Sequence, residues 1–365
     1  MLLSSVIDQF LPRLEQRYGH RLLPSHKRAL GAMRRCRTQN SRQMLACCPE
    51  CEHQTLIPHS CGHRLCPHCQ HFESQRWLEN QQQRLVPAEY FLVTFTVPRE
   101  LREIAYAHQR SFYNALMSCA WQTLSQFSEN DKELRGRTGA IAVLHTHSRR
   151  LAYHPHVHVV IPAAAINTRE RRWRTRAKGG FLFPQKALAQ VFRGKLLARL
   201  KADNLSAPAT TPTQWVVDCQ AVGRGEKAIT YLGRYLYRGV VSEKQIVAMT
   251  DDTVTYRYTD NTGTSRTRTL NGEDFLWLII QHTLPKGFRR ARNYGFLHGN
   301  CQTLIRLLQV LLLHNGLAAL APKQKRSAII CTQCNSEMRI VAVGLQLMPR
   351  RRDTEPPGEQ LLPVM

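Results

Sequence analysis

One short segment constrains the fold more than any other: residues 153–160, with the sequence YHPHVHVV. Histidine recurs at every second position, as His154, His156 and His158, and the positions between them hold proline or valine. Successive side chains of a β-strand point to opposite faces of a sheet. The segment therefore predicts a strand with a buried aliphatic face and a histidine face that is free for chemistry.

The histidine face predicts a metal site. His156 and His158 are two residues apart, about 6.6 Å along a strand, so they can bind one ion. The third ligand we favour is His145, which ends the preceding predicted strand (139–145) and can return beside them through a hairpin. His147 and His154 are rival candidates. A pair of hydrogen-bonded histidines without metal is the competing interpretation.

The overall charge predicts a polyanionic partner. Among 365 residues, 51 are Lys or Arg and 26 are Asp or Glu, which gives a formal net charge of +25. Nucleic acid fits this charge better than a membrane surface. The longest apolar helical stretch, 304–313, is about half of a membrane span, and the N-terminal sequence lacks the pattern of a signal peptide. We therefore expect nucleic acid as the partner, no membrane association, and a cytoplasmic, nucleoid-associated protein.

The cysteines predict structural zinc. Without an export signal the twelve cysteines should stay reduced. Two Cys-x2-Cys knuckles, Cys48/Cys51 and Cys66/Cys69, have a spacing that can surround one tetrahedral zinc ion and leave no position open for catalysis. We expect no regular secondary structure between residues 47 and 69. Further potential ligands nearby are Cys47, His59, Cys61, His63 and His68, which could contribute to a second site or replace one of these four ligands, although no second set of four stands out.

A third knuckle, Cys331-x2-Cys334, is only half of a zinc site, and Cys301 is the nearest other cysteine. Whether this knuckle binds zinc is left open by the sequence.

A predicted helix over residues 226–238 carries Tyr231 and Tyr235 one turn apart on the same face. Lys227 precedes Tyr231 by one turn, where its ammonium group can meet a phosphate or lower the pKa of a tyrosine. Taken alone, the pair is typical of core tyrosines. Beside a histidine-bound divalent ion, however, tyrosines can attack a phosphodiester and hold the DNA as a phosphotyrosine ester, which conserves the bond energy for rejoining.

Together these features resemble the two-tyrosine transposases of the insertion sequence 91 type, which are HUH endonucleases. The HVH sequence at 156–158 looks like their His-hydrophobic-His motif, and YLGRYLYRG looks like their tyrosine helix. The cluster from Cys48 to Cys69 is similar to their N-terminal zinc domain, and the Cys331/Cys334 knuckle also resembles a family feature. Further similar segments are 91–102, 144–162, 181–197 and 282–295, so that the resemblance covers roughly residues 8–340.

The resemblance implies an α+β fold, with a central antiparallel sheet flanked by helices, the HUH strand in its middle and the tyrosines on a helix nearby. It implies that Tyr231 and Tyr235 are the nucleophiles and that His156 and His158 bind Mg²⁺ or Mn²⁺. His147 stands where this family often has an aromatic residue, so the third ligand stays open.

We expect four segments. They are a helical zinc-binding DNA-recognition domain (1–90), a connecting strand and helix (91–138), the catalytic domain (139–315), and a basic C-terminal region with a knuckle and a disordered tail (316–365).

Two basic segments, 169–178 and 286–296, interleave cations with aromatic rings, a composition that suits single-stranded DNA. Solvated charged loops are the competing interpretation. The expected DNA contacts are Lys227, Arg234, Arg171, Arg172, Trp173, Arg174, Lys286, Arg289 and Arg290.

The expected function is a transposase that cleaves and rejoins single-stranded DNA at insertion-sequence ends through 5′-phosphotyrosine intermediates. A replication initiator or relaxase would use the same chemistry, and a non-catalytic zinc DNA-binding regulator would need neither the histidines nor the tyrosines. No P-loop or helicase segment is evident in the sequence, so host replication or helicase proteins are expected partners.

Overall fold

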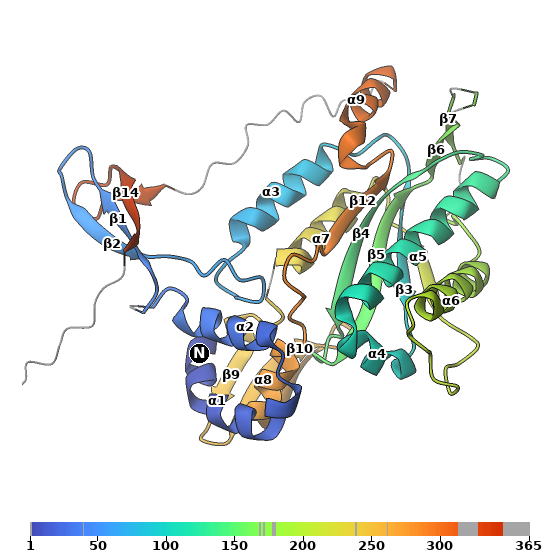
Figure 1. Ribbon diagram of the computed structural model, residues 1–365. Helices are drawn as coiled ribbons and strands as arrows, with labels where there is room; N and C mark the ends of the chain where they lie inside the picture. Colours follow the sequence, from blue (N-terminus) through green and yellow to red (C-terminus); the bar gives the residue numbers. More distant parts are fainter. Residues whose placement is uncertain are drawn as a thin grey trace, which may run out of the picture. The chain divides into compact units, whose positions relative to one another are not determined.

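The computed structural model describes residues 2–38, 40–167, 169–170, 172–176, 180–237, 239–260, 262–312 and 328–345, with backbone alone at 234 and 237. The chain forms two compact units (Figure 1). One contains residues 1–34 and 62–326, and the other contains residues 35–61 and the C-terminal segment from residue 327. These units divide the chain differently from the four expected segments, whose boundaries stay a prediction. The expected disordered tail from Pro349 lies outside the described residues.

The first unit is built on a five-stranded antiparallel sheet, in the order β12-β4-β5-β3-β8. The middle strand is β5, the histidine strand, so the expected α+β fold and the place of this strand in it are confirmed. The strands are β3 (Tyr90–Thr96), β4 (Gly139–His147), β5 (Tyr153–Pro162), β8 (Val217–Ala221) and β12 (Ala291–Gly295).

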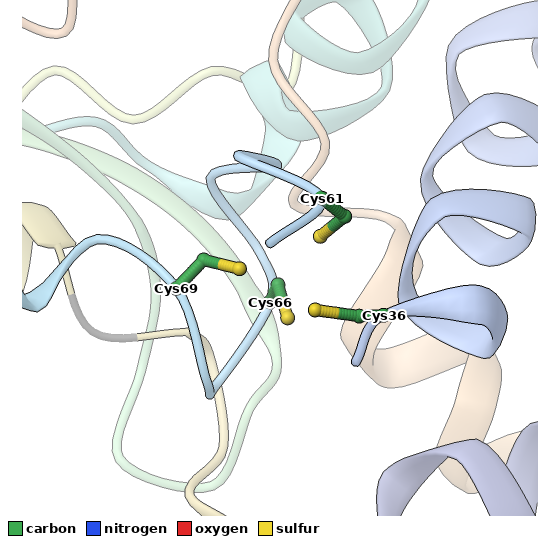
Figure 2. Close-up of side chains that lie close together, drawn as sticks. All are labelled: Cys36, Cys61, Cys66 and Cys69. Atoms are coloured by element: carbon green, nitrogen blue, oxygen red, sulfur yellow. The ribbon is translucent and has the colours of Figure 1, made fainter. Parts of the chain in front are cut away.

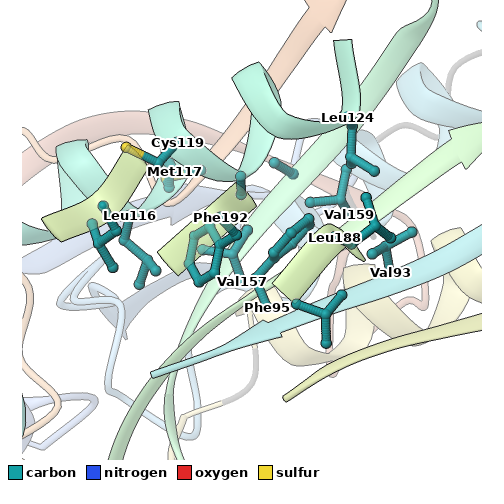
Figure 3. Close-up of a cluster of buried hydrophobic side chains, with 14 of the residues drawn as sticks. Val93, Phe95, Leu116, Met117, Cys119, Leu124, Val157, Val159, Leu188 and Phe192 are labelled. Carbon is teal, nitrogen blue, oxygen red and sulfur yellow. The ribbon is translucent and has the colours of Figure 1, made fainter. Parts of the chain in front are cut away.

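The aliphatic face of β5 belongs to the main hydrophobic core. Val157 and Val159 are fully buried there, beside Phe95 of β3 and Phe192 (Figure 3). The rings of Phe95 and Phe192 have centroids 4.8 Å apart. The covering helices are α5 (Gln109–Asn130) and α6 (Gln185–Ala202), with the shorter α4 (Arg102–Ala107) beside β5.

The opposite face of the sheet is covered by α7 (Glu226–Tyr237), whose buried Ile229 and Leu232 share a core cluster with Ile141 and Val143 of β4. Helix α3 (His71–Gln82) packs against α7 (Figure 1). The amphipathic pattern of α7 explains this arrangement, because its apolar side meets the sheet while the tyrosine side faces the histidines.

The remaining elements of this unit lie around the sheet. Helix α1 packs against α8, where the ring of Tyr18 stacks on Trp277 with centroids 4.8 Å apart. These elements are α1 (Leu3–Tyr18), α2 (Pro24–Arg35), α8 (Gly272–Ile280), α9 (Gln302–Leu311), the pair β6 (Ala164–Asn167) and β7 (Arg172–Thr175), and the meander β9 (Ile246–Met249), β10 (Thr253–Thr259) and β11 (Ser265–Asn271). Among the described helices, none combines the length and apolarity that crossing a bilayer requires.

The second unit is a small antiparallel sheet in the order β13-β14-β1-β2. Strand β1 pairs with β2 on one side and with β14, from the other end of the sequence, on the other side. Because β2 lies within residues 47–69, the expectation that this segment lacks regular structure is wrong. The strands are β1 (Gln43–Cys47), β2 (Gln54–Pro58), β13 (Ile329–Ile330) and β14 (Glu337–Leu345).

Candidate active site

Three histidines converge on the face of the sheet that is turned toward α7. His145 of β4 is the cross-strand partner of His156, and His158 follows on the same strand. Each of the three offers one ring nitrogen, and these nitrogens all lie within 4.8 Å of one another. Such a spacing can bring all three nitrogens to one metal ion.

Hydrogen bonds orient the rings of the histidine group. Nδ1 of His156 lies 2.7 Å from the carbonyl oxygen of His154, and Nδ1 of His158 lies 2.9 Å from the hydroxyl of Thr94. Nδ1 is thus occupied in both rings, and Nε2 is left to bind a metal. The Nε2 atom of His145 is buried without a hydrogen-bond partner in the described part of the chain. A buried polar atom without a hydrogen-bond partner requires an explanation, and a bond from this nitrogen to a metal ion would explain it.

The protonation state of the group also suits a metal. Burial lowers the pKa of His156 to about 4 and that of His158 to about 3, so both rings are neutral near pH 7. Neutral imidazole is the form that binds metals. Of the two ions expected, three imidazole nitrogens favour Mn²⁺ over Mg²⁺, which prefers oxygen ligands.

The two rival ligands have other contacts. Nδ1 of His154 accepts a hydrogen bond from Arg102 at 2.8 Å. His147 follows an irregularity in the β4–β5 pairing, and its ring stacks on Tyr235 with centroids 4.8 Å apart. The structure thus groups His145, and neither rival, with His156 and His158.

The two tyrosines of α7 both face the histidines, but their surroundings differ. Tyr231 is 50% exposed, and its ring centroid is 6.0 Å from that of His158. Tyr235 stacks on His145 with centroids 3.2 Å apart, and its hydroxyl is buried with no hydrogen-bond partner among the described residues. Burial raises the pKa of both phenols, that of Tyr235 to about 12. Both tyrosines are therefore protonated near neutral pH.

Arg290 holds the region around Tyr235 in place. Its Nε donates to the carbonyl of Leu144 at 3.0 Å, and its Nη1 donates to the carbonyl of Leu236 at 3.3 Å. The guanidinium carbon lies 4.7 Å from the centroid of the Tyr235 ring. Arg290 was expected to contact DNA, but these contacts tie α7 to β4 and put the charge against the tyrosine.

A pocket of about 730 Å³ opens beside the tyrosines. Both tyrosines and His147 line it, together with the loop Pro67–Cys69 and residues of α3. A second pocket, of about 500 Å³, lies at the start of α7 and is lined by Arg224, Lys227 and Tyr231 among others. Tyr231 therefore borders both cavities, and cations border the second.

The tyrosine helix is supported closely by α3 and by the loop before it. A Cβ atom on Gly233 would lie 3.3 Å from the ring of Trp77, and the hydroxyl of Ser74 donates to the carbonyl of Gly233 at 3.0 Å. A Cβ atom on Gly239 would approach the carbonyl oxygen of Leu65 to 2.5 Å. Glycine at these two positions permits the close packing.

The cysteines form two groups of four. In one, Cys66 and Cys69 are joined by Cys36 and Cys61 (Figure 2). In the other, Cys48 and Cys51 are joined by Cys331 and Cys334. Within each group the sulfur atoms all lie within 4.8 Å of one another.

This grouping differs from the single zinc site expected from the sequence. The structure does not bring the Cys48/Cys51 knuckle to the Cys66/Cys69 knuckle, because the first knuckle is the tip of the β1–β2 hairpin and faces the C-terminal knuckle. Cys61 was predicted only as a further potential ligand, and Cys36 was not predicted, because it stands alone in the sequence without a spacing signal.

In the basic segment 169–178, the described side chains mostly make local contacts. Arg172 is exposed on β7, whereas Arg174 forms an ion pair with Glu170. Trp173 packs against Phe296, with ring centroids 5.5 Å apart. Arg171 lies outside the described residues, as does the side chain of Arg234.

The segment at 286–296 separates its charges from its rings. Lys286 and Arg289 are exposed. Phe288 and Phe296 are buried, and Tyr294 stacks on Trp121 with centroids 5.2 Å apart. The rings expected to stack on bases thus pack inside the protein, and the exposed cations remain candidates for phosphate contacts. Thr94 and Arg102 were not found from the sequence, because tertiary packing sets their histidine partners. Thr94 lies opposite His158 in the β3–β5 pairing, and Arg102 reaches His154 from α4.

Comparisons with known proteins agree on one family. The model of the family described as "Putative transposase" matches residues 139–304, and that described as "Transposase zinc-binding domain" matches residues 6–97. The chain is 30% identical over 313 residues to "Putative transposase y4qJ" of Sinorhizobium fredii, covering 77% of this chain and 78% of that protein. It is 28% identical over 300 residues to "Transposase for insertion sequence element IS801" of Pseudomonas savastanoi pv. phaseolicola, covering 73% and 72%. No solved structure matches the chain.

Proposed function

The chain belongs to the insertion sequence 91 family of transposases, and from this premise we propose that it cleaves and rejoins single-stranded DNA at element ends through bonds to Tyr231 and Tyr235. The observation that carries the proposal is the approach of both tyrosine rings to the histidine group. The ring centroid of Tyr231 lies 6.0 Å from that of His158, and the ring centroid of Tyr235 lies 3.2 Å from that of His145. A nucleophile and a metal-binding group on facing elements are what phosphodiester cleavage needs.

The residues proposed to hold the divalent ion are His145, His156 and His158, with Mn²⁺ favoured by the donor set. A bound ion would polarise the scissile phosphate and offset its charge. Thr94 and the carbonyl of His154 act as positioning groups, because they fix the rings of His158 and His156.

Lys227 and Arg224 are proposed to bind phosphates next to Tyr231, since both cations border the same cavity as this tyrosine. Arg172, Lys286 and Arg289 are exposed cations that can contact the DNA backbone further away. Each such contact should make binding more sensitive to salt.

We further propose that Tyr231 makes the first cleavage. Its side chain is half exposed, so a DNA strand can reach it, whereas the hydroxyl of Tyr235 is buried between α7 and the sheet. Tyr235 must leave this position before it can attack a phosphate. The two tyrosines would then act in sequence, one for each cleavage.

In each cleavage the phenolic oxygen forms a bond to phosphorus and the P–O3′ bond breaks. The 5′ phosphate stays on the tyrosine as an ester, and the free 3′ hydroxyl gains a proton equivalent to the one that the phenol loses. Because the ester keeps the energy of the broken bond, attack by another 3′ hydroxyl can rejoin the strand without ATP.

The decisive experiment traps the covalent intermediate. The protein is incubated with single-stranded oligonucleotides of the element ends and Mn²⁺, and adducts are resolved on a denaturing gel. The wild type should form an adduct, Tyr235→Phe should retain most of the first adduct, and Tyr231→Phe should lose it. The variant Tyr237→Phe, on the same helix, is the matched control and should behave like the wild type.

An adduct in the double variant Tyr231→Phe/Tyr235→Phe would refute the tyrosine assignment. A first adduct that depends on Tyr235 rather than Tyr231 would overturn the proposed order only. A non-catalytic regulator predicts no adduct in any protein, with DNA binding unchanged by either substitution.

The host partners of the protein and its location in the cell stay predictions. DNA is the partner that the transposase family implies. We propose that host replication or helicase proteins supply the single strands and that the protein works at the nucleoid.

A further inference from the structure

The second group of cysteines lies outside the candidate active site and joins two distant parts of the sequence. Sγ of Cys48 is 3.4 Å from Sγ of Cys334, and Sγ of Cys51 is 3.6 Å from Sγ of Cys331. Four sulfur atoms bound to one tetrahedral zinc at about 2.3 Å would be about 3.8 Å apart. A disulfide would bring two sulfurs to about 2.05 Å. The observed spacing therefore matches a shared metal ion and excludes disulfides between these pairs.

The two knuckles have the same backbone structure. In each, the amide of the first cysteine donates to the carbonyl five positions later at 2.9 Å, and the amide four positions later donates back to the cysteine carbonyl at 3.0 Å. The residue at that fourth position, Glu52 or Asn335, has a left-handed backbone with φ of 57° or 59°. This repeated turn presents two thiolates on one side, as a zinc knuckle does.

Each knuckle is the tip of a hairpin, and the hairpins share one sheet. The first connects β1 to β2 and the second connects β13 to β14, with β1 paired to β14 along its whole length. Two hairpins that each contribute one knuckle make up a zinc ribbon.

The sheet has too little apolar core to explain its own stability. Its buried hydrophobic cluster consists of Ala46, Cys48, Cys331 and Met338, and two of these four are cysteines of the group. A domain of this size normally needs a metal or disulfides to fold.

We propose that Cys48, Cys51, Cys331 and Cys334 bind a second structural zinc ion, which completes a zinc ribbon from two hairpins at opposite ends of the sequence. The C-terminal hairpin lies outside residues 6–97 and 139–304, which the family models match. It is nevertheless half of a zinc domain. The whole chain between the hairpins must therefore be synthesised before this domain can close.

The first test counts zinc in the purified full-length protein by elemental mass spectrometry. The wild type should hold two zinc ions per chain, and Cys331→Ser/Cys334→Ser should hold one. Cys66→Ser/Cys69→Ser should also hold one, because it removes the other group. Cys301→Ser, at a cysteine outside both groups, is the control and should retain two.

A wild type with one zinc ion, or a C-terminal double variant that keeps two, would overturn the proposal. A variant that fails to fold gives no count, so a second measurement uses the wild type alone. Cys51 and Cys334 are exposed, and a free thiol there would react readily with an alkylating reagent. Peptide mass spectrometry should show both protected until a chelator is added, after which all four cysteines are alkylated together. Rapid alkylation of Cys334 before chelation would exclude the zinc site.

Discussion

The two sheets of this protein use candidate metal ligands in opposite ways. The five-stranded sheet is covered on both faces by hydrophobic clusters, and its three histidines are added to a core that is already complete. The four-stranded sheet has a core of a few residues, and cysteines make up half of it. Burial of apolar surface stabilises the first, whereas the second depends on the proposed zinc.

A metal ion at the histidines would serve catalysis, whereas a metal ion at the cysteines would serve folding. Three histidine nitrogens leave positions of an ion open for a phosphate, whereas four thiolates fill a tetrahedral zinc. Loss of the ion should thus abolish activity in the first sheet and abolish structure in the second.

Chelation should distinguish the two sheets most strongly. Structural zinc sites contribute roughly 10–16 kcal/mol of binding free energy, which is folding free energy where no other core exists. Removal of zinc should therefore accelerate amide hydrogen exchange in residues 43–58 and 329–345 by roughly a thousandfold or more. Residues 139–162, in β4 and β5, should exchange as before. Hydrogen-exchange mass spectrometry with and without chelator measures both regions in one sample.

Re-addition of zinc is the control and should restore slow exchange in residues 43–58 and 329–345. Unchanged exchange there after complete removal of zinc would show that the small sheet folds without metal, and the contrast between the sheets would fail.

Substitutions on the two faces of the five-stranded sheet should separate stability from metal binding. Phe192→Ala opens a cavity against the aliphatic face of β5 and should destabilise the unit by about 3–5 kcal/mol. His156→Asn, on the other face, should change stability little but remove most Mn²⁺ binding, since asparagine can still donate to the carbonyl of His154. Urea unfolding followed by tryptophan fluorescence reports on this unit alone, because all five tryptophans lie in it. Electron paramagnetic resonance measures free Mn²⁺.

A loss of several kcal/mol in His156→Asn would show that the histidine face also supports the fold. Normal Mn²⁺ binding in that variant would remove His156 from the proposed ligand set.

Local patterns predicted the central strands β4 and β5 of the five-stranded sheet, whereas the edge strand β12 lies in a segment predicted only to contact DNA. The alternation at residues 153–160 needs only the period of a strand to assign its two faces, and the spacing of Tyr231 and Tyr235 needs only the period of a helix. The predicted partnership of His145 with His156 also followed from local order, because a hairpin pairs neighbouring strands. These inferences rest on residues that are close together in the sequence.

The small sheet shows where such inference stops. Its strands β1 and β14 are separated by almost the whole chain, and no periodic pattern in the sequence predicts that they pair. Three knuckles in the sequence permit several pairings, and the nearest pair is not the one that forms. Similarly, Trp173 and Phe288 were predicted among the DNA-stacking rings, but Phe288 is buried in the core and Trp173 packs against Phe296. Tertiary packing decided all three outcomes.

Acid should act on the two units by different routes, which gives the smallest predicted effect. In the zinc ribbon, protons compete with zinc for the thiolates. In the first unit, His26 is fully buried between Tyr106 and Trp277, and its Nδ1 accepts from the amide of Leu23 at 3.3 Å. Burial lowers the pKa of His26 from 6.5 to about 4.

The direction of the effect follows from this lowered pKa. The unfolded chain takes up the proton near pH 6.5, whereas the folded chain resists it until about pH 4. The contribution of His26 to stability is therefore fully present above pH 6.5 and is lost as the pH falls toward 4, by about 3 kcal/mol in total. His26→Asn keeps an acceptor for the amide of Leu23 but does not titrate, so its unfolding free energy should fall less steeply between these pH values. Urea unfolding followed by tryptophan fluorescence at pH 7, 6, 5 and 4 compares the slopes. Parallel curves for the variant and the wild type would exclude His26 as the source of the acid sensitivity and would leave the other buried histidines of this unit, His147 and His282 among them, to account for it.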